Sequence, residues 1–152
     1  EIRLSLRQNI LIPFVKRELV AFFYIELEKL GYHTSLVEAE GYDIIVNILN
    51  KPIRLQVKSS GTTDKHSAKG GRPRYNFSTS VGKVKRKLTK ADTDIVALAA
   101  LRENVVIFKP VEEITGCTTK ISEAHFENKE STKESFERCL KNIKLLDKES
   151  YL

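Results

Sequence analysis

Residues 41–60 read GYDIIVNILNKPIRLQVKSS. The runs 41–48 and 53–58 are rich in β-branched residues and alternate between apolar and polar side chains, a pattern typical of half-buried strands. The tripeptide at 50–52, Asn-Lys-Pro, separates the two runs and has the composition of a tight turn. The stretch therefore predicts a β-hairpin, and the other elements are expected to be arranged around it.

One face of this hairpin should carry polar side chains of different chemistry. Because strand side chains have a period of two, Arg54, Gln56 and Lys58 are expected on one face, while the apolar residues between them enter the core. The expected two-residue loop is Asn50–Lys51. That register puts Asp43 opposite Lys58 and diagonal to Gln56, with opposed Cβ atoms about 5 Å apart. An acid, an amide and a lysine would then be within reach of one ligand.

Helical and strand patterns alternate through the rest of the sequence. From Pro13 to Leu30 the apolar residues recur every three or four positions, which predicts an amphipathic helix that ends at Gly31. The other expected elements are strands at 32–37, 74–79, 94–101 and 105–108, a short helical or irregular segment at 111–114, and a C-terminal amphipathic helix with Ser131 and Glu134 as its capping box. This order predicts an α/β or α+β domain in which helices flank a central mixed β-sheet.

The length of 152 residues fits one domain with a single core. We expect residues 1–152 to form that domain, with its core at about 13–114 and with 1–12 and 115–152 as elements that contact other subunits. No apolar run is long enough to span a bilayer, and no basic-then-apolar leader opens the sequence. These features predict a cytoplasmic protein without membrane contact.

The positive charge is concentrated in one segment. Of a net charge of +6, residues 65–90 contribute +9 and contain no Asp or Glu, so the remaining residues are net negative. Such a segment favours a polyanionic partner, and nucleic acid is the commonest one. A solvated charged surface is the alternative interpretation. The residues expected to bind DNA are Lys65, Lys69, Arg72, Arg74, Lys83, Lys85, Arg86, Lys87 and Lys90.

The hairpin residues have the chemistry that metal-dependent phosphodiester hydrolysis requires. Mg²⁺ prefers oxygen ligands and keeps several waters, so Asp43, a side-chain or backbone carbonyl and a scissile phosphate can bind it together. Lys58 is then available to orient or deprotonate the attacking water, or to stabilise negative charge in the transition state. The alternative is a plain surface ion pair between Asp43 and Lys58.

Glu18 is the residue that disturbs the amphipathic pattern of the first helix. It precedes Phe22 by one turn and adjoins Leu19, so its carboxylate is expected at the edge of the face that packs on the sheet. The ordinary interpretation of such a residue is a solvated acid that pairs with a nearby base.

Tyr42-Asp43 followed by Gln56-Val57-Lys58, with a helix that contains Glu18 upstream, resembles the PD-(D/E)xK nuclease superfamily, in particular its members with Gln at the second acidic position. The similarity extends to the cyanobacterial group I intron-encoded homing endonucleases of this superfamily. It covers about Pro13 to Ile114 and implies a restriction-endonuclease-like core, with a central mixed β-sheet flanked by helices. The further residues that carry it are those at 54–59, 75–78 and 88–98.

The resemblance implies a role for each residue of the motif. Asp43 corresponds to the central metal ligand, Gln56 to a second ligand through its amide oxygen, and Lys58 to the catalytic lysine. The Val57 carbonyl is implied as a further ligand, and Glu18 as an acid contributed by the helix. The implied cofactor is Mg²⁺, for which other divalent cations such as Mn²⁺ substitute.

Two residues depart from the family pattern. Tyr42 replaces the usual proline, and the neutral Gln56 replaces an acid. The loss of one negative charge should weaken the affinity for a divalent metal, which gives Glu18 more importance as a ligand.

The function implied by the resemblance is a sequence-specific, Mg²⁺-dependent endonuclease that makes double-strand breaks in duplex DNA. A chain of this length is expected to carry one active site, so cutting both strands requires a homo-oligomer, either a dimer or a tetramer. A Holliday-junction resolvase or a restriction-type nuclease of the same superfamily is an alternative. A non-catalytic nucleic-acid-binding protein that uses only the basic segment is another.

Overall fold

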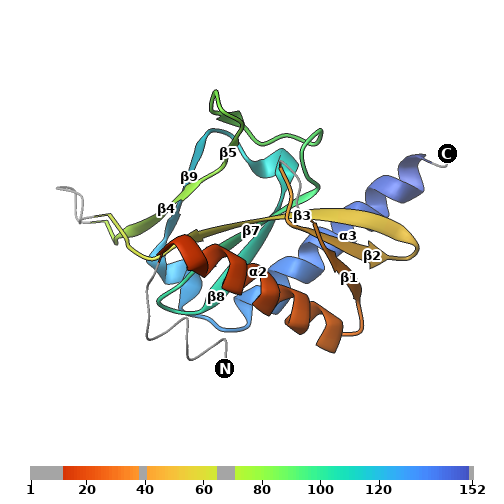
Figure 1. Cartoon of the computed structure of the whole chain (residues 1–152), viewed down its shortest axis with the longest axis horizontal. Helices are drawn as coiled ribbons and strands as arrows, with labels where there is room; N and C mark the ends of the chain where they lie inside the picture. Colours follow the sequence, from red (N-terminus) through yellow and green to blue (C-terminus); the bar gives the residue numbers. More distant parts are fainter. Residues whose placement is uncertain (1–11, 38–40, 65–70, 151–152) are drawn as a thin grey trace.

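The computed structural model describes residues 12–37, 41–64 and 71–150, with the side chains of 12–18, 22 and 144–150 left undescribed. Its centre is a five-stranded sheet in the order β1-β2-β3-β7-β8 (Figure 1). β3 and β7 are parallel and every other neighbouring pair is antiparallel, so the sheet is mixed, as expected. The strands are β1 (His33–Leu36), β2 (Ile44–Ile48), β3 (Lys51–Ser60), β7 (Ile95–Ala100) and β8 (Val105–Pro110).

Two helices, α2 (Ile12–Lys29) and α3 (Ser131–Ser150), pack on one face of this sheet. The expected end of the first helix is confirmed. The Tyr32 amide donates to the Leu27 carbonyl and the Gly31 amide to the Glu28 carbonyl, and Gly31 has a φ of +91°. This left-handed residue closes the helix in the manner that favours glycine. The apolar layer between the helices and the sheet, here called the helix-side core, includes Leu19, Phe23, Leu27, Leu55, Val57, Phe108 and Phe136.

The opposite face of the sheet is covered by short strands instead of helices (Figure 1). They are β4 (Arg74–Ser78) paired with β9 (Thr118–Ser122), and β5 (Ser80–Val81) paired with β6 (Arg86–Lys87). Two 3₁₀ turns, Val111–Glu113 and Glu123–Phe126, complete this side. The apolar layer beneath them, here called the strand-side core, includes Tyr75, Phe77, Leu88, Val96, Leu98 and Phe126. Because β7 has a core on both faces, all of its residues are buried, as its apolar sequence predicts.

The hairpin at 41–60 forms, but its turn lies one residue earlier than expected. Ile48 pairs with Lys51, so the loop is Leu49–Asn50, and these two residues have φ values of 52° and 63°. Positive φ at both positions is the geometry of a tight hairpin turn whose twist matches the strands. The expected loop was therefore wrong. The pairing shifts by two residues, which is an even number and leaves every side chain on its expected face.

The sequence did not predict β9 or its pairing with β4. Thr118–Ser122 has one buried residue, Ile121, so its composition gives little strand signal. Phe126 and Phe136 are also buried, which places described parts of the C-terminal segment within the two cores. In the turn before α3, Asn128 Oδ1 accepts from the Glu130 amide, and the Glu134 amide donates to the Glu130 carbonyl. The expected capping contact between Ser131 and Glu134 is not among the hydrogen bonds of the described residues.

In the part of the chain that the structure describes, no helix is long and apolar enough to cross a membrane. The first expected subunit-contact element, 1–12, lies almost entirely outside the described residues.

Candidate active site on the central hairpin

Asp43 extends the pairing of β2 with β3 through its side chain. Its backbone amide donates to the Leu55 carbonyl at 2.8 Å, and its Oδ2 accepts from the Val57 amide at 2.8 Å. The carboxylate thus takes the place of a main-chain acceptor at the point where β2 begins. In this register Asp43 is the next residue along from the Ile44–Leu55 pair, so it lies opposite Gln56 and diagonal to Lys58, the reverse of the expected arrangement.

Gln56 is the buried member of the polar face, with 5% of its surface exposed. Its Nε2 donates to the Val57 carbonyl at 3.4 Å. No hydrogen bond to its Oε1 is present among the described residues, and none of their buried side-chain oxygens lacks a partner, so Oε1 reaches solvent. That oxygen is the atom expected to bind a metal.

Lys58 is half-buried and points to the strand-side of the sheet. Its Nζ donates to the Ser80 carbonyl at 3.2 Å, which joins it to the first residue of β5. Ile53, Leu55 and Val57 are buried in the helix-side core, so the expected division of the strand between two faces is confirmed.

The oxygen atoms gathered at the hairpin are a carboxylate, an amide and a backbone carbonyl. This donor set suits Mg²⁺, which prefers hard oxygen ligands and retains water. The described residues contain no group of three or more His, Cys, Asp or Glu that could bind a metal, so Asp43 needs a carboxylate from elsewhere to complete an acidic site. Glu18 lies within α2, but its side chain is outside the described set, and its expected role stays a prediction.

Arg54 and Asp94 form a network that the sequence did not indicate. Asp94 Oδ2 accepts from the Arg54 amide at 2.7 Å and from its Nε at 3.2 Å, and Lys90 Nζ lies 2.8 Å from Asp94 Oδ1. Burial by itself would raise the pKa of Asp94, but these hydrogen bonds outweigh it and lower that pKa. The Arg54 guanidinium also lies over the Tyr42 ring, at 5.9 Å from its centroid. The network therefore reaches Tyr42, the residue that directly precedes Asp43.

A second ion pair joins the basic segment, 65–90, to Asp92, which lies shortly before β7. The two terminal guanidinium nitrogens of Arg86, Nη1 and Nη2, donate to Asp92 at 2.8 and 2.7 Å, and the Thr89 amide donates to Asp92 at 2.9 Å. Asp92 packs against Gly41, where an added Cβ would lie 3.0 Å from the Asp92 Cβ, and Gly41 has a φ of +98°. Both facts require glycine two residues before Asp43.

This pair predicts a loss of stability in acid. The hydrogen bonds from Arg86 outweigh burial and lower the pKa of Asp92 from 3.8 to about 2. A carboxyl whose pKa is lower in the folded than in the unfolded protein stabilises the fold at any pH above its unfolded-state pKa. This stabilisation is lost as the pH falls toward the folded-state pKa. We expect the parent to exceed Asp92→Asn in free energy of unfolding by on the order of 2 kcal/mol at neutral pH, measured by urea titration. A difference that does not shrink between pH 5 and pH 2 would contradict this.

Several basic residues expected to bind DNA have acidic partners that lie outside the segment 65–90. Arg72 pairs with Glu123 and Glu127, and Arg74 pairs with Asp64. Arg86 and Lys90 also pair with acids outside the segment. The segment 65–90 contains no acid, but acids from elsewhere in the chain neutralise several of its basic residues. Among the described residues, those of the nine that are exposed and have no carboxylate partner are Lys83, Lys85 and Lys87. Lys65 and Lys69 lie outside the described residues.

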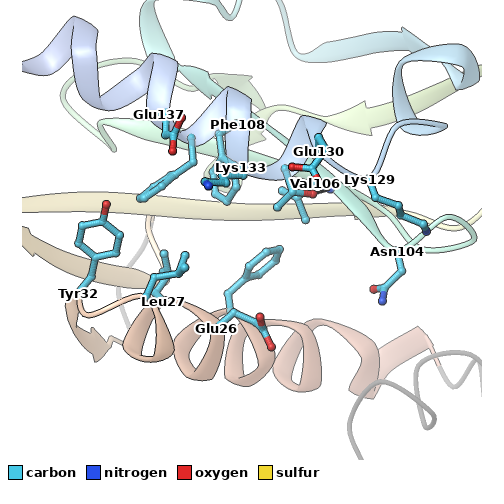
Figure 2. Close-up of a pocket in the computed structure, with 14 residues that line it drawn as sticks. Glu26, Leu27, Tyr32, Asn104, Val106, Phe108, Lys129, Glu130, Lys133 and Glu137 are labelled. Atoms are coloured by element: carbon cyan, nitrogen blue, oxygen red, sulfur yellow. Dashed lines mark hydrogen bonds between the residues drawn. The ribbon is translucent and has the colours of Figure 1, made fainter.

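A pocket of about 390 Å³ lies on the other side of the sheet, between α2 and α3. Figure 2 shows Leu27 and Tyr32 facing Lys133 and Glu137 across it, with Phe108 beside Lys133. Its apolar lining belongs to the helix-side core, so it does not include the polar face of β3. This pocket and the candidate site are therefore separate.

The sequence matches no protein-family model and no curated protein. Among solved structures, this chain is similar to a bacterial homing endonuclease, I-Ssp6803I, with 15% sequence identity, 70% of each chain covered and a TM-score of 0.49. Similarity at this level says nothing about single residues. The roles of Asp43, Gln56 and Lys58 therefore depend on the geometry of the site.

Proposed function

We propose that this chain is a Mg²⁺-dependent endonuclease that hydrolyses phosphodiester bonds in duplex DNA, with its active site at the β2–β3 hairpin. The observation that supports this most is the hydrogen bond of 2.8 Å between Asp43 Oδ2 and the Val57 amide. It brings a carboxylate to β3 between an amide with a solvent-reaching oxygen, Gln56, and a half-buried lysine, Lys58. Along the chain, the carboxylate, the amide and the lysine follow one another in the order of the PD-(D/E)xK motif that the sequence resembles.

Each residue has a distinct part in the proposed reaction. Asp43, the Gln56 amide oxygen and the Val57 carbonyl would bind the cation, with Glu18 as an added carboxylate. When bound, the cation lowers the pKa of a water and neutralises charge on the reacting phosphate. Lys58, which the Ser80 carbonyl orients, places an ammonium beside these groups, where it aligns the attacking water and stabilises the developing charge.

The neutral Gln56 predicts a weak metal site that an acid would strengthen. We expect Gln56→Glu to lower the Mg²⁺ concentration for half-maximal cleavage by about three- to tenfold, because it adds a negative charge beside Asp43. Mn²⁺ titration followed by calorimetry checks the affinity without DNA. Gln56→Leu is the control of similar size, and it should weaken binding. An unchanged affinity in both variants would remove Gln56 from the proposed ligand set.

A cleavage assay on several forms of DNA identifies the class of substrate. Purified protein is incubated in Mg²⁺ or EDTA with long linear duplexes, supercoiled plasmid and four-way junctions, and the new ends are captured and sequenced. Metal-dependent double-strand ends at a repeated sequence support the proposal, and sedimentation should then show a dimer or tetramer. Preferential cutting of junctions would indicate a resolvase instead. Salt-sensitive binding with no cleavage, unchanged in Asp43→Ala, would indicate a non-catalytic binding protein.

A further inference from the structure

We propose that the β5–β6 hairpin enters the major groove of DNA and that Val84, at its tip, reads thymine by contact with the 5-methyl group. The inference rests on the proposed function, because it assigns a base-reading element to the same active site. Figure 1 shows β5 on the side of the sheet opposite α2.

Val84 is the most exposed of the large apolar residues that the structure describes. It is 87% exposed, whereas the next, Leu49, is 73% exposed. It lies in the four-residue loop that joins β5 to β6, where Val81 pairs with Arg86. A β-branched apolar side chain is unusual in a tight turn, where Gly, Asn, Asp and Ser predominate. A partner that covers it would remove apolar surface from water.

The surroundings of Val84 specify a polyanionic partner. Lys83 and Lys85 are its neighbours in sequence and Lys87 follows in β6. All three are exposed, and among the described residues none has a carboxylate partner. A two-stranded ribbon fits the major groove of B-form DNA, where an apolar side chain can contact the thymine methyl while the lysines contact phosphates.

The hairpin is firmly held at its base and adjoins the catalytic lysine. The buried Leu88 donates its amide to the Thr79 carbonyl at 3.0 Å, and the Arg86–Asp92 ion pair braces β6 from the side. Lys58 bonds to the carbonyl of Ser80, four residues before Val84. Four extended residues span at most about 13 Å. The major groove is about 8.5 Å deep, so one docking can bring the tip to base edges and a phosphate to Lys58.

A lipid surface is the other partner that a basic hairpin with an apolar tip can bind. One valine buries too little apolar area for stable membrane attachment, and even a single acyl chain binds only marginally. The connection of the hairpin to Lys58 and, through Asp92, to Gly41 favours DNA instead.

The experiment is a selection of bound sequences from a random duplex library, with Ca²⁺ in place of Mg²⁺ so that binding is measured without cleavage. The parent, Val84→Ser and the matched control Leu49→Ser, which alters an exposed apolar residue at the other hairpin tip, are compared. We expect the parent and Leu49→Ser to select thymine at a shared position and Val84→Ser to lose that preference. Replacing that thymine with uracil, which lacks the methyl, should weaken parent binding by about three- to tenfold and leave Val84→Ser binding unchanged. Equal thermal midpoints establish that all three proteins are folded.

Three results would overturn the inference: an unchanged motif in Val84→Ser, an equal uracil effect in parent and variant, or no enriched sequence with the parent. Loss of binding to anionic phospholipid vesicles in Val84→Ser, with DNA selection unchanged, would assign the tip to a membrane. Because the selection needs no cleavage, enrichment of a thymine motif by a parent that cuts no DNA would refute the proposed function and leave this inference intact. DNA cleavage by the parent, with a selected motif that does not change in Val84→Ser, would support the proposed function and refute this inference.

Discussion

Lys58→Ala should lower the rate of DNA cleavage by about 10²- to 10⁴-fold while DNA affinity changes little. In free energy this is a loss of about 3–5 kcal/mol of transition-state stabilisation. The reason is local, because Lys58 is half-buried on the polar face of β3 and its Nζ is oriented by the Ser80 carbonyl at 3.2 Å. Its ammonium is therefore already oriented on the face of β3 where Asp43 accepts from the Val57 amide, and it should need little reordering when the substrate binds.

Lys51→Ala is the matched control for this experiment. Lys51 is a half-buried lysine on the same strand, seven residues or about 23 Å from Lys58, at the turn end of the hairpin. The control removes the same charge and should cleave within about twofold of the parent. Single-turnover rates at saturating protein separate the chemical step from binding. Equal rates for Lys58→Ala and the parent would show that the lysine has no catalytic part.

Phe126→Ala should lower the free energy of unfolding by about 3–5 kcal/mol. Phe126 is fully buried, and its ring lies 5.3 Å from that of Tyr75 and 6.0 Å from that of Phe77, centroid to centroid. These contacts join the segment after β9 to β4, so the truncation leaves a cavity in the strand-side core. Urea unfolding at neutral pH measures the loss.

The control for the core prediction is the adjacent His125→Ala, because His125 is exposed in the same 3₁₀ turn. We expect its free energy of unfolding to change by less than about 0.5 kcal/mol. If Phe126→Ala were as mild as this control, the segment from 115 onward would not belong to the folded core.

The hairpin and its two faces were predictable because strand periodicity is a local property. The apolar residues of β3 identify the buried face, and an error of two residues in the pairing keeps that face unchanged. The pairing itself depends on whether Leu49 adopts a positive φ, which a leucine seldom does and which the sequence does not indicate. The expected partners of Asp43 on β3 were therefore exchanged: Gln56 lies opposite it and Lys58 lies diagonal to it.

Contacts between distant segments could not be predicted in the same way. Asp92 and Asp94 precede an apolar strand, and only the parallel pairing of β7 with β3 brings Asp94 to Arg54. The acids that meet Arg72, Glu123 and Glu127, likewise come from a segment far along the sequence. Such pairs have no periodic signal, so the basic segment looked more exposed to a polyanion than it is. Among the described residues of the segment, Lys83, Lys85 and Lys87 are the ones that stay exposed without a carboxylate partner.

The comparison of the parent with Asp43→Asn tests the central claim most directly, because this change keeps the shape of the side chain and removes its charge. Both proteins are incubated with a large pool of duplex DNA in Mn²⁺, and new 5′ and 3′ ends are counted by sequencing. The account predicts ends that accumulate with the parent, disappear in EDTA and fall by at least about 10²-fold in Asp43→Asn, with DNA affinity preserved. Equal numbers of ends from the two proteins, or none from the parent, would contradict it.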